Sequence, residues 1–525
     1  MGLGEPSAIA PWPERNGRHL LVNSAQMAAL EEQLFASGLP VEALMEKAAL
    51  AVSRLLLEQH GERLGRHGAL VLVGPGHNGG DGLVIARELH LAGISTAIWS
   101  PFERHKPLSA AHLRHALWLG IHRLESSPDP SSAALWIDAL LGSGQRRAPG
   151  EAIEALLQQR QRQRPDALVA IDVPTGLCAD SGQATGTYTA QAISTYAIGL
   201  IKTGLVQDAA LEAVGALHWV DLGLPPWLLQ QLPINAPLAL AERDLAARPK
   251  PKFNPAASKY QRGRLLVVAG SDTYRGAASL ALAGASSSGC GSLRAALPEA
   301  LASSIWQQHP QVVVSLDPLA ELDPQRLDAL LVGPGLGPTA PPMPQAGPDE
   351  PDYWRSLLGW PGLLVLDADG LNHLEVQMTQ GLGLQASHWL QQRQGATWIT
   401  PHPGEFARLF PELAGSPALE AAGQAAASSG ACVLLKGARS IVAAPDGRRW
   451  QLLEASPGSA RTGLGDVLAG YAAGLGAMAL AASGNADASW LAAAALAHAQ
   501  AGRQGEQGEG GFTPMQVAQN LACLC

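Results

Sequence analysis

The chain has 525 residues, which is too long for one ordinary domain, since domains usually have about 100–200 residues. Hydrophobic residues make up 47% of the chain and charged residues 15%, so the apolar surface is sufficient to exclude intrinsic disorder as the main state. The net charge of −9 excludes a general electrostatic attraction to nucleic acid or to anionic lipid.

Short apolar runs recur along the chain, separated by Ala-, Leu-, Glu- and Gln-rich stretches of helical length. The runs are continuous rather than alternating, which is typical of strands buried on both faces of a parallel sheet. Their alternation with helices predicts an α/β architecture throughout. In chain order the predicted strands are Ala69–Val73, Leu135–Asp138, Leu168–Val173, Leu265–Ala269, Val312–Leu316, Ala329–Val332, Leu363–Asp367, Thr397–Thr400 and Cys432–Leu435.

A proline-rich segment between Leu222 and Pro255 predicts a semi-stiff linker between two domains. A second proline-rich stretch, Pro338–Asp352, predicts an exposed insertion loop, because strands continue after it. The apolar segment Val467–Ser483 has only 17 residues, is rich in Ala and Gly, and follows Asp466 directly. A membrane-spanning helix needs about 20 strongly apolar residues, so this segment predicts a buried helix.

A glycine-dense loop, Gly74–Gly82, follows the first predicted strand and precedes a predicted helix at Leu83–Leu91. Glycines allow backbone N–H groups to approach a ligand, and a helix N-terminus favours an anion, so the loop predicts a phosphate cradle. Asn78 and Asp81 could instead cap the helix. Two further strands end at Asp138 and Asp172 beside glycine loops, and ligands collect beyond the carboxyl ends of parallel strands. We therefore expect the three loops to line one crevice.

In the second half, Lys436–Ser440 follows a strand, and Gly458–Asp466 opens the apolar helix. Glycines at a helix N-terminus form an anion hole, and Asp466 is placed to act as a general base for phosphoryl transfer. Asp466 could instead be only a favourable acid in the first helical turn. Asp367 and Asp369 end another strand, and His402 and Glu405 follow the next. No zinc spacing, H-E-x-x-H or G-x-S-x-G motif is present, so nothing indicates a metalloprotease or a serine hydrolase.

The first half resembles the epimerase domain of NAD(P)H-hydrate repair enzymes over about Leu20 to Leu224. The matching stretches are Leu44–Ala49, Asn78–Gly82, Asp138–Gly144, Ile171–Gly176 and Lys202–Gly204. The resemblance implies a Rossmann-like three-layer fold, with Asp172 as the catalytic residue. It also implies a potassium ion held by Asn78, Asp138 and Thr175. The implied contacts with the hydrated nucleotide are His77, Asn78, Gly79, Gly80, Asp81, Gly142, Ser143, Gly144, Gln145, Arg146, Arg147, Ala148 and Asp172. His77 departs from the family, which usually has Asn there, and a pH-sensitive charge is expected from it.

The second half resembles the ribokinase-like, nucleotide-dependent NAD(P)H-hydrate dehydratase from about Arg243 onward. The matching stretches are Gly270–Ser271, Tyr274–Ala277, Val332–Gly337, Leu366–Asn372, Thr400–Phe406, Lys436–Gly437 and Gly463–Asp466. The implied contacts with the hydrated nucleotide are Ala277, Gly335, Gly337, His402 and Asp466, with Asp466 catalytic. The implied contacts with the adenine nucleotide are Lys436, Gly437, Ala438, Arg439, Ser440 and Gly465. Arg461, Thr462 and Leu464 depart from the family pattern, but backbone donors survive such changes.

We therefore predict two α/β domains, a Rossmann-like one at 20–224 and a ribokinase-like one at 243–525, joined by a linker at 225–242. The resemblance implies an enzyme that epimerises the R- and S-hydrates of NADH and NADPH. It implies dehydration of the S form at the expense of ADP, giving AMP and phosphate, with K⁺ in the first domain and Mg²⁺ on the nucleotide in the second.

Two alternatives stay open at this point. One is a ribokinase-like small-molecule kinase with a regulatory N-terminal domain, and the other is a nucleotide-sensing scaffold with degenerate sites. Five widely spaced cysteines cannot form a disulfide framework, so we expect a cytoplasmic protein. We also expect a homo-oligomer that binds small molecules and neither nucleic acid nor membrane.

Overall fold

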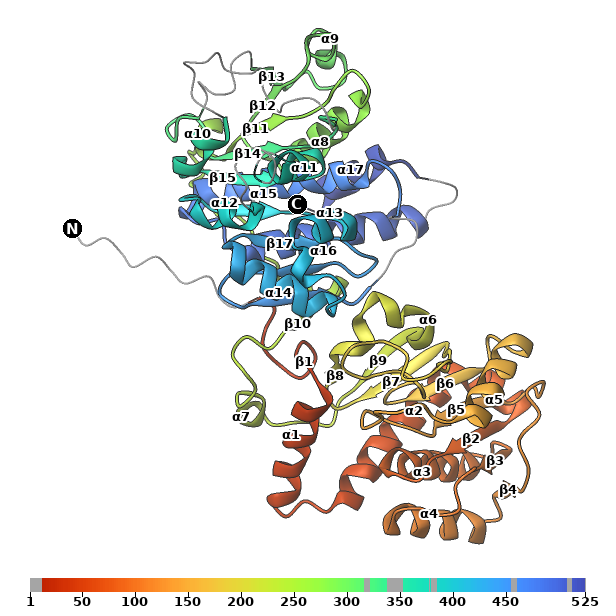
Figure 1. Cartoon of the computed structure of the whole chain (residues 1–525). Helices are drawn as coiled ribbons and strands as arrows, with labels where there is room; N and C mark the ends of the chain where they lie inside the picture. The colour runs from red at the N-terminus through yellow and green to blue at the C-terminus, as the bar shows by residue number, and fades with distance from the viewer. Residues whose placement is uncertain are drawn as a thin grey trace. The chain divides into compact units, whose positions relative to one another are not determined.

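The protein was analysed as a computed structural model that describes residues 12–315, 322–337, 353–376, 378, 385–454, 460–507 and 512–524. The chain divides into two compact units. The amino-terminal unit is Arg15–Pro237, and the carboxy-terminal unit combines Met1–Glu14 with Leu238–Cys525. Figure 1 draws the first in red to yellow and the second mainly in green to blue.

The amino-terminal unit contains a seven-stranded, wholly parallel sheet. Leu70 and Leu72 belong to one apolar cluster and Val71 and Val73 to another, so helices bury both faces of the sheet. The three-layer Rossmann-like prediction is confirmed. The strand order is β4 (His122–Leu124), β3 (Thr96–Trp99), β2 (Ala69–Val73), β5 (Leu135–Ala139), β6 (Leu168–Ile171), β7 (Ser194–Ile198) and β9 (Ala216–Val220). Its longer helices are α1 (Ser24–Ala36), α2 (Val41–His67), α3 (His77–Leu91), α4 (Pro107–Trp118) and α5 (Glu151–Gln163).

The carboxy-terminal unit contains a ten-stranded sheet. Leu265 and Val267 pack into one cluster and Leu266 and Val268 into the other, so this unit also has three layers (Figure 1). The order is β10 (Leu238–Leu240), β19 (Arg449–Leu452), β18 (Ile441–Ala443), β17 (Cys432–Leu435), β16 (Thr397–Ile399), β15 (Leu363–Leu366), β14 (Ala329–Val332), β11 (Arg264–Val268), β12 (Ser292–Ala296) and β13 (Val313–Val314). The prediction of a parallel sheet fails at β18, which is antiparallel to both neighbours because short turns, not helices, connect it to them.

Two helical layers cover this second sheet. One cluster includes α8 (Arg275–Ser287), α15 (Leu464–Ser483), α16 (Ala488–Gln507) and α17 (Pro514–Cys523). The other includes α10 (Tyr353–Gly359), α11 (Asp369–Val376), α12 (Ala386–Gln392), α13 (Pro403–Leu409) and α14 (Ala418–Ser429). The structure therefore agrees with the predicted ribokinase-like layering.

The long apolar helix α15 is a core helix. It has a mean hydropathy of 1.4, and 78% of its most apolar window is buried. It packs on α8 at glycines: a Cβ on Gly470 would lie 1.9 Å from the Ala281 carbonyl oxygen, and one on Gly284 would lie 2.1 Å from that of Val467. The small residues that suggested a tightly packed buried helix thus allow two backbones to meet, and that prediction is confirmed.

The predicted linker at 225–242 is not a separate segment in the structure. Its first part forms α7 (Pro226–Leu229), since proline is suited to the first helical turn, and stays with the amino-terminal unit. Leu238–Leu240 is instead strand β10, which pairs in parallel with β19. Trp12 also belongs to the carboxy-terminal unit, where its indole donates to the Asp244 carbonyl at 3.2 Å. The predicted insertion loop Pro338–Asp352 lies outside the described residues.

Candidate active sites

The loops after β2, β5 and β6 line one cavity of about 630 Å³ at the carboxyl edge of the first sheet. This is the crevice expected from the parallel order. Nine of the predicted contacts lie in its lining: His77, Asn78, Asp81, Gly142, Ser143, Gly144, Gln145, Arg146 and Asp172. Four do not, namely Gly79, Gly80, Arg147 and Ala148.

Helix α3 begins at His77, six residues before the predicted start at Leu83. Its early glycines let the helix approach the sheet, since a Cβ on Gly79 would lie 2.0 Å from the Gly74 carbonyl oxygen and one on Gly82 would lie 2.5 Å from the Ala139 Cβ. Gly76 is the N-cap, and no side chain caps the helix. Asn78 and Asp81 are therefore not caps, and both line the cavity.

Asp172 has a buried lysine as its partner. The Lys202 ammonium donates to the Asp172 carboxylate at 2.5 Å, and only 1% of the lysine side chain is exposed. The Ser143 backbone N–H donates to the other carboxylate oxygen at 3.1 Å. The φ of Asp172 is +63°, a conformation that costs a non-glycine residue free energy and that is typical of functional sites. Lys202 occurred in a matching stretch, but nothing in the sequence assigned it this role.

The acids around this pair are shifted toward their neutral forms. Burial raises the pKa of Asp81 well above its usual range, and the charges of Asp172 and Glu31 raise it further. Burial likewise raises the pKa of Glu31. Burial and then the nearby Lys106 lower the pKa of His77, so the imidazole is neutral near pH 7 and adds no charge to the cavity.

Several cavity residues were not predicted, and they come from outside the glycine loops. Besides Ile198 and Lys202, they are Ser24, Ala25, Ala28, Glu31 and Lys106, and these five have no motif of their own. The i, i+4, i+7 spacing of Ser24, Ala28 and Glu31 on one helix face is the single signal that could have linked three of them.

Asn78 lines the cavity, whereas Asp138 and Thr175 are fully buried and lie against each other. The Thr175 backbone N–H and hydroxyl each donate to the Asp138 carboxylate at 2.8 Å. Burial raises the pKa of Asp138 to about 6, although these hydrogen bonds lower it. The side-chain amide of Asn78 is buried and has no hydrogen-bond partner among the described residues, and Gly142 lies against it. A buried carboxylate, a hydroxyl and an unpartnered amide oxygen are a donor set that a cation would satisfy.

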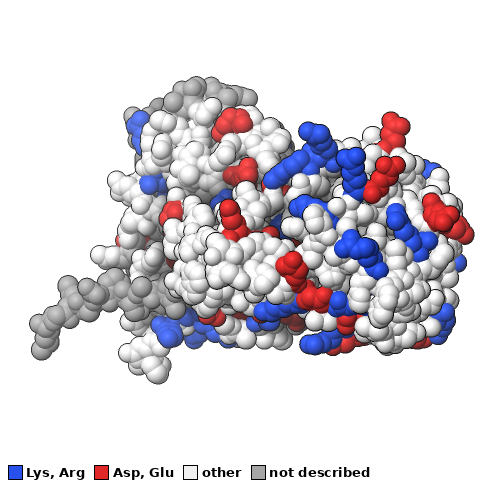
Figure 2. Space-filling view, turned by 90° about the horizontal axis from the view of Figure 1, so that it is seen from below, with Lys and Arg blue, Asp and Glu red and all other residues white. Residues whose placement is uncertain are grey.

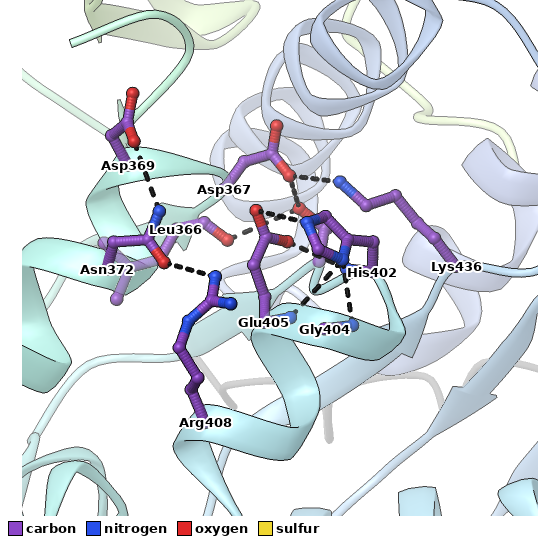
Figure 3. A network of polar contacts seen from close by, with 10 residues as sticks. Leu366, Asp367, Asp369, Asn372, His402, Gly404, Glu405, Arg408 and Lys436 are labelled. Atoms are coloured by element: carbon purple, nitrogen blue, oxygen red, sulfur yellow. Dashed lines mark hydrogen bonds and ion pairs between the residues drawn. The ribbon is translucent and has the colours of Figure 1, made fainter. Parts of the chain in front are cut away.

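The second site lies at the carboxyl edge of the other sheet and also contains a lysine–aspartate pair. The Lys436 ammonium lies 2.6 Å from the Asp367 carboxylate (Figure 3). The same carboxylate accepts from the Thr400 hydroxyl at 2.7 Å. Burial lowers the pKa of Lys436, but Asp367 and then Glu405 more than offset this, so its pKa is raised. The lysine keeps its positive charge.

Asp466 lies in the first turn of α15, whose N-cap is Gly463 with a φ of +91°. Burial and then the neighbouring charge of Asp367 raise the pKa of Asp466 to about 7. A Cβ on Gly465 would lie 3.6 Å from the Lys436 nitrogen, so the helix start and the lysine adjoin. Leu464 is 2% exposed and belongs to the core, so its departure from the family pattern leaves the backbone donors in place. Gly458 and Ser459 lie outside the described residues.

His402 caps α13 and lies in the same network. Its Nδ1 accepts from the Gly404 backbone N–H at 2.9 Å, and the Glu405 carboxylate accepts from the His402 backbone N–H at 2.8 Å (Figure 3). These two hydrogen bonds form a capping box, so His402, which was predicted as a site residue, also has a structural role. The imidazole side chain is still 53% exposed.

The remaining predicted residues are those expected to contact the hydrate, Ala277, Gly335 and Gly337, and those expected to contact the adenine nucleotide, in the 436–440 loop. Gly335 has a φ of +65°, and a Cβ there would lie 2.6 Å from the Ala277 Cβ, so these two residues adjoin. The Gly337 backbone N–H donates to Asp369 at 2.8 Å. In the 436–440 loop, the Gly437 backbone N–H donates to the Ser440 hydroxyl at 3.4 Å, and the Gln451 amide donates to the Arg439 carbonyl at 2.8 Å. The loop around Ala438 is therefore held at both ends.

Comparison with known proteins gives the family. Residues 265–522 match the family described as NAD(P)H-hydrate dehydratase, and residues 41–204 match the family described as YjeF-related protein N-terminus. A bifunctional NAD(P)H-hydrate repair enzyme of Gloeobacter violaceus is 40% identical over 86% of this chain and 87% of its own length. One from Escherichia coli is 31% identical over 84% of this chain and 82% of its own length. This chain belongs to the family of bifunctional NAD(P)H-hydrate repair enzymes.

Among solved structures, an ADP/ATP-dependent NAD(P)H-hydrate dehydratase from Bacillus subtilis, co-crystallised with ATP and Mg²⁺, is 24% identical. It covers 54% of this repair-enzyme chain and 95% of its own, with a TM-score of 0.42. The YjeF-related match contains the three sheet-edge loops and Lys202 but begins after α1. The cavity of this family member is thus lined partly by residues that the match does not include.

Proposed function

We propose that the cavity of the amino-terminal unit interconverts the R- and S-hydrates of NADH and NADPH. The site in the carboxy-terminal unit would dehydrate the S form. Family membership supports both activities. The observation that carries the proposal is that each sheet has its own lysine–aspartate ion pair at its carboxyl edge, with an aspartate that is mostly buried, so one chain holds two separate polar sites.

The first cavity suits a nicotinamide nucleotide. Its volume of about 630 Å³ lies within the usual range for small-molecule sites. Asp172, paired with Lys202, is the catalytic base. The residues from His77 to Asp81, in the first turns of α3, and the residues from Gly142 to Ala148 form the binding segments. Lys106 and Arg146 line the same cavity and supply positive charge for the phosphates of the ligand.

Asn78, Asp138 and Thr175 are the residues that would hold potassium. A single carboxylate with two neutral oxygens suits a weakly hydrated monovalent cation better than Mg²⁺, which demands more charge. When bound, the cation would supply charge that braces the loops carrying Asp172. Among the described residues, no group of three or more His, Cys, Asp or Glu side chains is arranged to hold a metal ion, and this proposed site does not depend on one.

The potassium proposal predicts that Asp138→Ala weakens both substrate binding and epimerisation, while dehydration of pure S-hydrate stays normal. Epimerase rates and melting temperatures would be measured in potassium and in a bulky organic cation. A binding signal for the cation, seen as a potassium-dependent rise in the melting temperature, should disappear in the variant. If the wild-type protein is indifferent to the cation, the potassium site is wrong.

In the second site the hydroxyl of the S-hydrate attacks the terminal phosphoryl group of ADP, and Asp466 accepts the hydroxyl proton. AMP leaves, and the phosphorylated carbon then loses phosphate while a neighbouring carbon loses a proton, which restores the ring double bond. Ala277, Gly335, Gly337 and His402 contact the hydrate, and Lys436–Ser440 with Gly465 hold the adenine nucleotide. Mg²⁺ bound to that nucleotide would neutralise phosphate charge.

The test is an assay of the whole protein with hydrated NADH, ADP and Mg²⁺. We expect the absorbance band of the reduced nicotinamide to return, with AMP and phosphate formed in equal amounts. A small-molecule kinase would instead accumulate a phosphorylated product without that band. Replacing ADP with ATP tests the preference for ADP.

We also propose a cytoplasmic homo-oligomer. The cysteines Cys178, Cys290, Cys432 and Cys523 are free, which fits a reducing compartment. On the face drawn in Figure 2, Lys and Arg side chains lie among Asp and Glu and between uncharged residues. Light scattering of the purified protein would give the oligomeric state.

A further inference from the structure

Helix α1 supplies one part of the epimerase cavity wall, through Ser24, Ala25, Ala28 and Glu31. Three of these are small and leave room for a ligand. Glu31 is the one ionisable side chain among these four lining residues. The next residue, Glu32, is exposed, so the same helix carries one glutamate facing the cavity and one facing solvent.

The start of α1 is fixed to the strand that carries Lys202. Strand β1 (Leu21–Val22) pairs in parallel with β8 (Ile201–Lys202), and Val22 lies opposite Lys202. The Ser24 backbone N–H donates to Asp180 at 2.6 Å, and Arg146 donates to the Ser24 hydroxyl at 2.7 Å. These contacts fix the start of α1 relative to the strand of Lys202, and therefore also place Glu31, which lies two turns further along the helix.

The Glu31 carboxyl is available to a ligand. Among the described residues it has no hydrogen-bond or ion-pair partner, whereas Asp172 has both Lys202 and Ser143. Burial raises the pKa of Glu31, Lys202 opposes this, and Asp172 adds to it. The other charged or titratable groups that line the cavity are His77, Asp81, Lys106 and Arg146.

Epimerisation of the hydrate needs two proton-transfer groups. The hydroxyl-bearing carbon is bonded to the ring nitrogen, whose lone pair can expel the hydroxyl. That hydroxyl leaves as water once it accepts a proton, and water then adds to the other face of the ring while it loses a proton to a base. One proton is given and one is taken, so the net reaction is an inversion at carbon. Asp172, whose carboxylate is paired with Lys202, can serve as the acceptor, and a second group in the cavity must donate.

We propose that Glu31 is this second catalytic residue of the epimerase. It donates a proton to the leaving hydroxyl on the α1 side of the cavity, while Asp172 accepts a proton from the water that adds on the opposite side. The two roles exchange in the reverse direction. This role rests on the proposed epimerase function of the same cavity.

The experiment compares whole-protein variants Glu31→Gln, Glu31→Asp and the matched control Glu32→Gln. Purified R-hydrate is supplied without ADP, and S-hydrate formation is followed by chromatographic separation. We expect Glu31→Gln to lower kcat by about 10²–10⁴-fold, the usual range for losing a general acid–base group, with KM unchanged. Glu31→Asp should recover part of the rate, and Glu32→Gln should behave as wild type.

The pH profile gives a second readout. The donor must hold its proton, so the wild-type rate should fall at alkaline pH, and Glu31→Gln should lack that limb. All variants should dehydrate pure S-hydrate normally and melt as wild type does.

Two results would overturn the role of Glu31. One is a Glu31→Gln variant with normal kcat, including the case in which Asp81→Asn alone abolishes the rate. The other is a rise in KM with kcat and the pH profile unchanged, which would mean binding only. A wild-type protein without epimerase activity would instead overturn the proposed function and this role together.

Discussion

The carboxyl edges of the two sheets both hold a lysine–aspartate ion pair, but they use the paired acid differently. Each holds a lysine ammonium against an aspartate, at 2.5 Å for Lys202 and Asp172 and at 2.6 Å for Lys436 and Asp367. Each also has a non-glycine residue with positive φ at the strand end, Asp172 at +63° and Ala368 at +48°. Such a residue costs about 1–3 kcal/mol and persists where the surrounding fold determines it.

The difference lies in which acid is paired. At the first edge the strained residue is itself the paired acid, so Lys202 fixes the direction of its carboxylate. At the second edge the lysine pairs with Asp367, and Asp466 is a separate acid whose pKa is raised to about 7. The second site thus separates charge for phosphates from proton transfer, which a reaction with a phosphoryl group requires.

The largest expected effect tests that separation. Asp466→Asn is nearly isosteric and removes the carboxylate, so dehydration should fall by about 10²–10⁴-fold. Epimerisation should stay as in wild type, and the melting temperature at pH 7 should not fall, because the change removes a carboxylate whose charge is disfavoured by burial. The measurement is S-hydrate turnover with ADP and Mg²⁺. Near-normal turnover would mean that Asp466 is only a helix-terminus acid.

A second prediction tests the fixed pair of the first site. Lys202→Met leaves a poorly solvated Asp172 charge without its partner, which should destabilise the amino-terminal unit by about 3–5 kcal/mol. Asn tolerates positive φ, so the double variant Lys202→Met/Asp172→Asn should recover much of that loss. Denaturant unfolding of the single and double variants measures both. Equal stability of the two variants would contradict a fixed charged pair.

The dehydration rate and the stability should both depend on pH through Asp466. Asp466 must be ionised to accept a proton, so dehydration should rise with pH through about 7. Because its folded-state pKa is raised above the unfolded value, the folded state binds more protons, and this group's contribution to stability falls as pH rises from about 4 to 7. Rates and melting temperatures of wild type and Asp466→Asn across that range check both signs. The variant should lack both trends.

The smallest effect concerns His402, where capping and substrate contact coincide. His402→Ala should cost about 1 kcal/mol through loss of the cap, whereas Asn restores a cap acceptor. If the imidazole also contacts the hydrate, His402→Asn should keep the stability and still raise KM for S-hydrate. A His402→Asn variant with unchanged KM would leave the residue a cap alone.

Strands made of uninterrupted apolar residues were predictable, and Ala69–Val73, Ala329–Val332 and Cys432–Leu435 have the predicted bounds. Strands such as β7, which begins with Ser194 and Thr195, were missed because polar residues interrupt the apolar pattern. The start of α3 was placed too late because glycines suggest a loop, while packing against β2 and β5 makes the helix begin at His77.

The sequence by itself determined the glycine loops, the acids at the strand ends and the family motifs, because these lie within short stretches of chain. Only the tertiary structure decided which groups meet. Lys202 reaches Asp172 across 30 residues, and the Trp450 indole donates to the Trp12 carbonyl across 438. Glu31 enters the cavity because β1 pairs with β8. A local sequence pattern predicts the structure that a segment can form. The charge and reactivity of a side chain depend on its burial and on its contacts with distant segments, and a local pattern does not specify these.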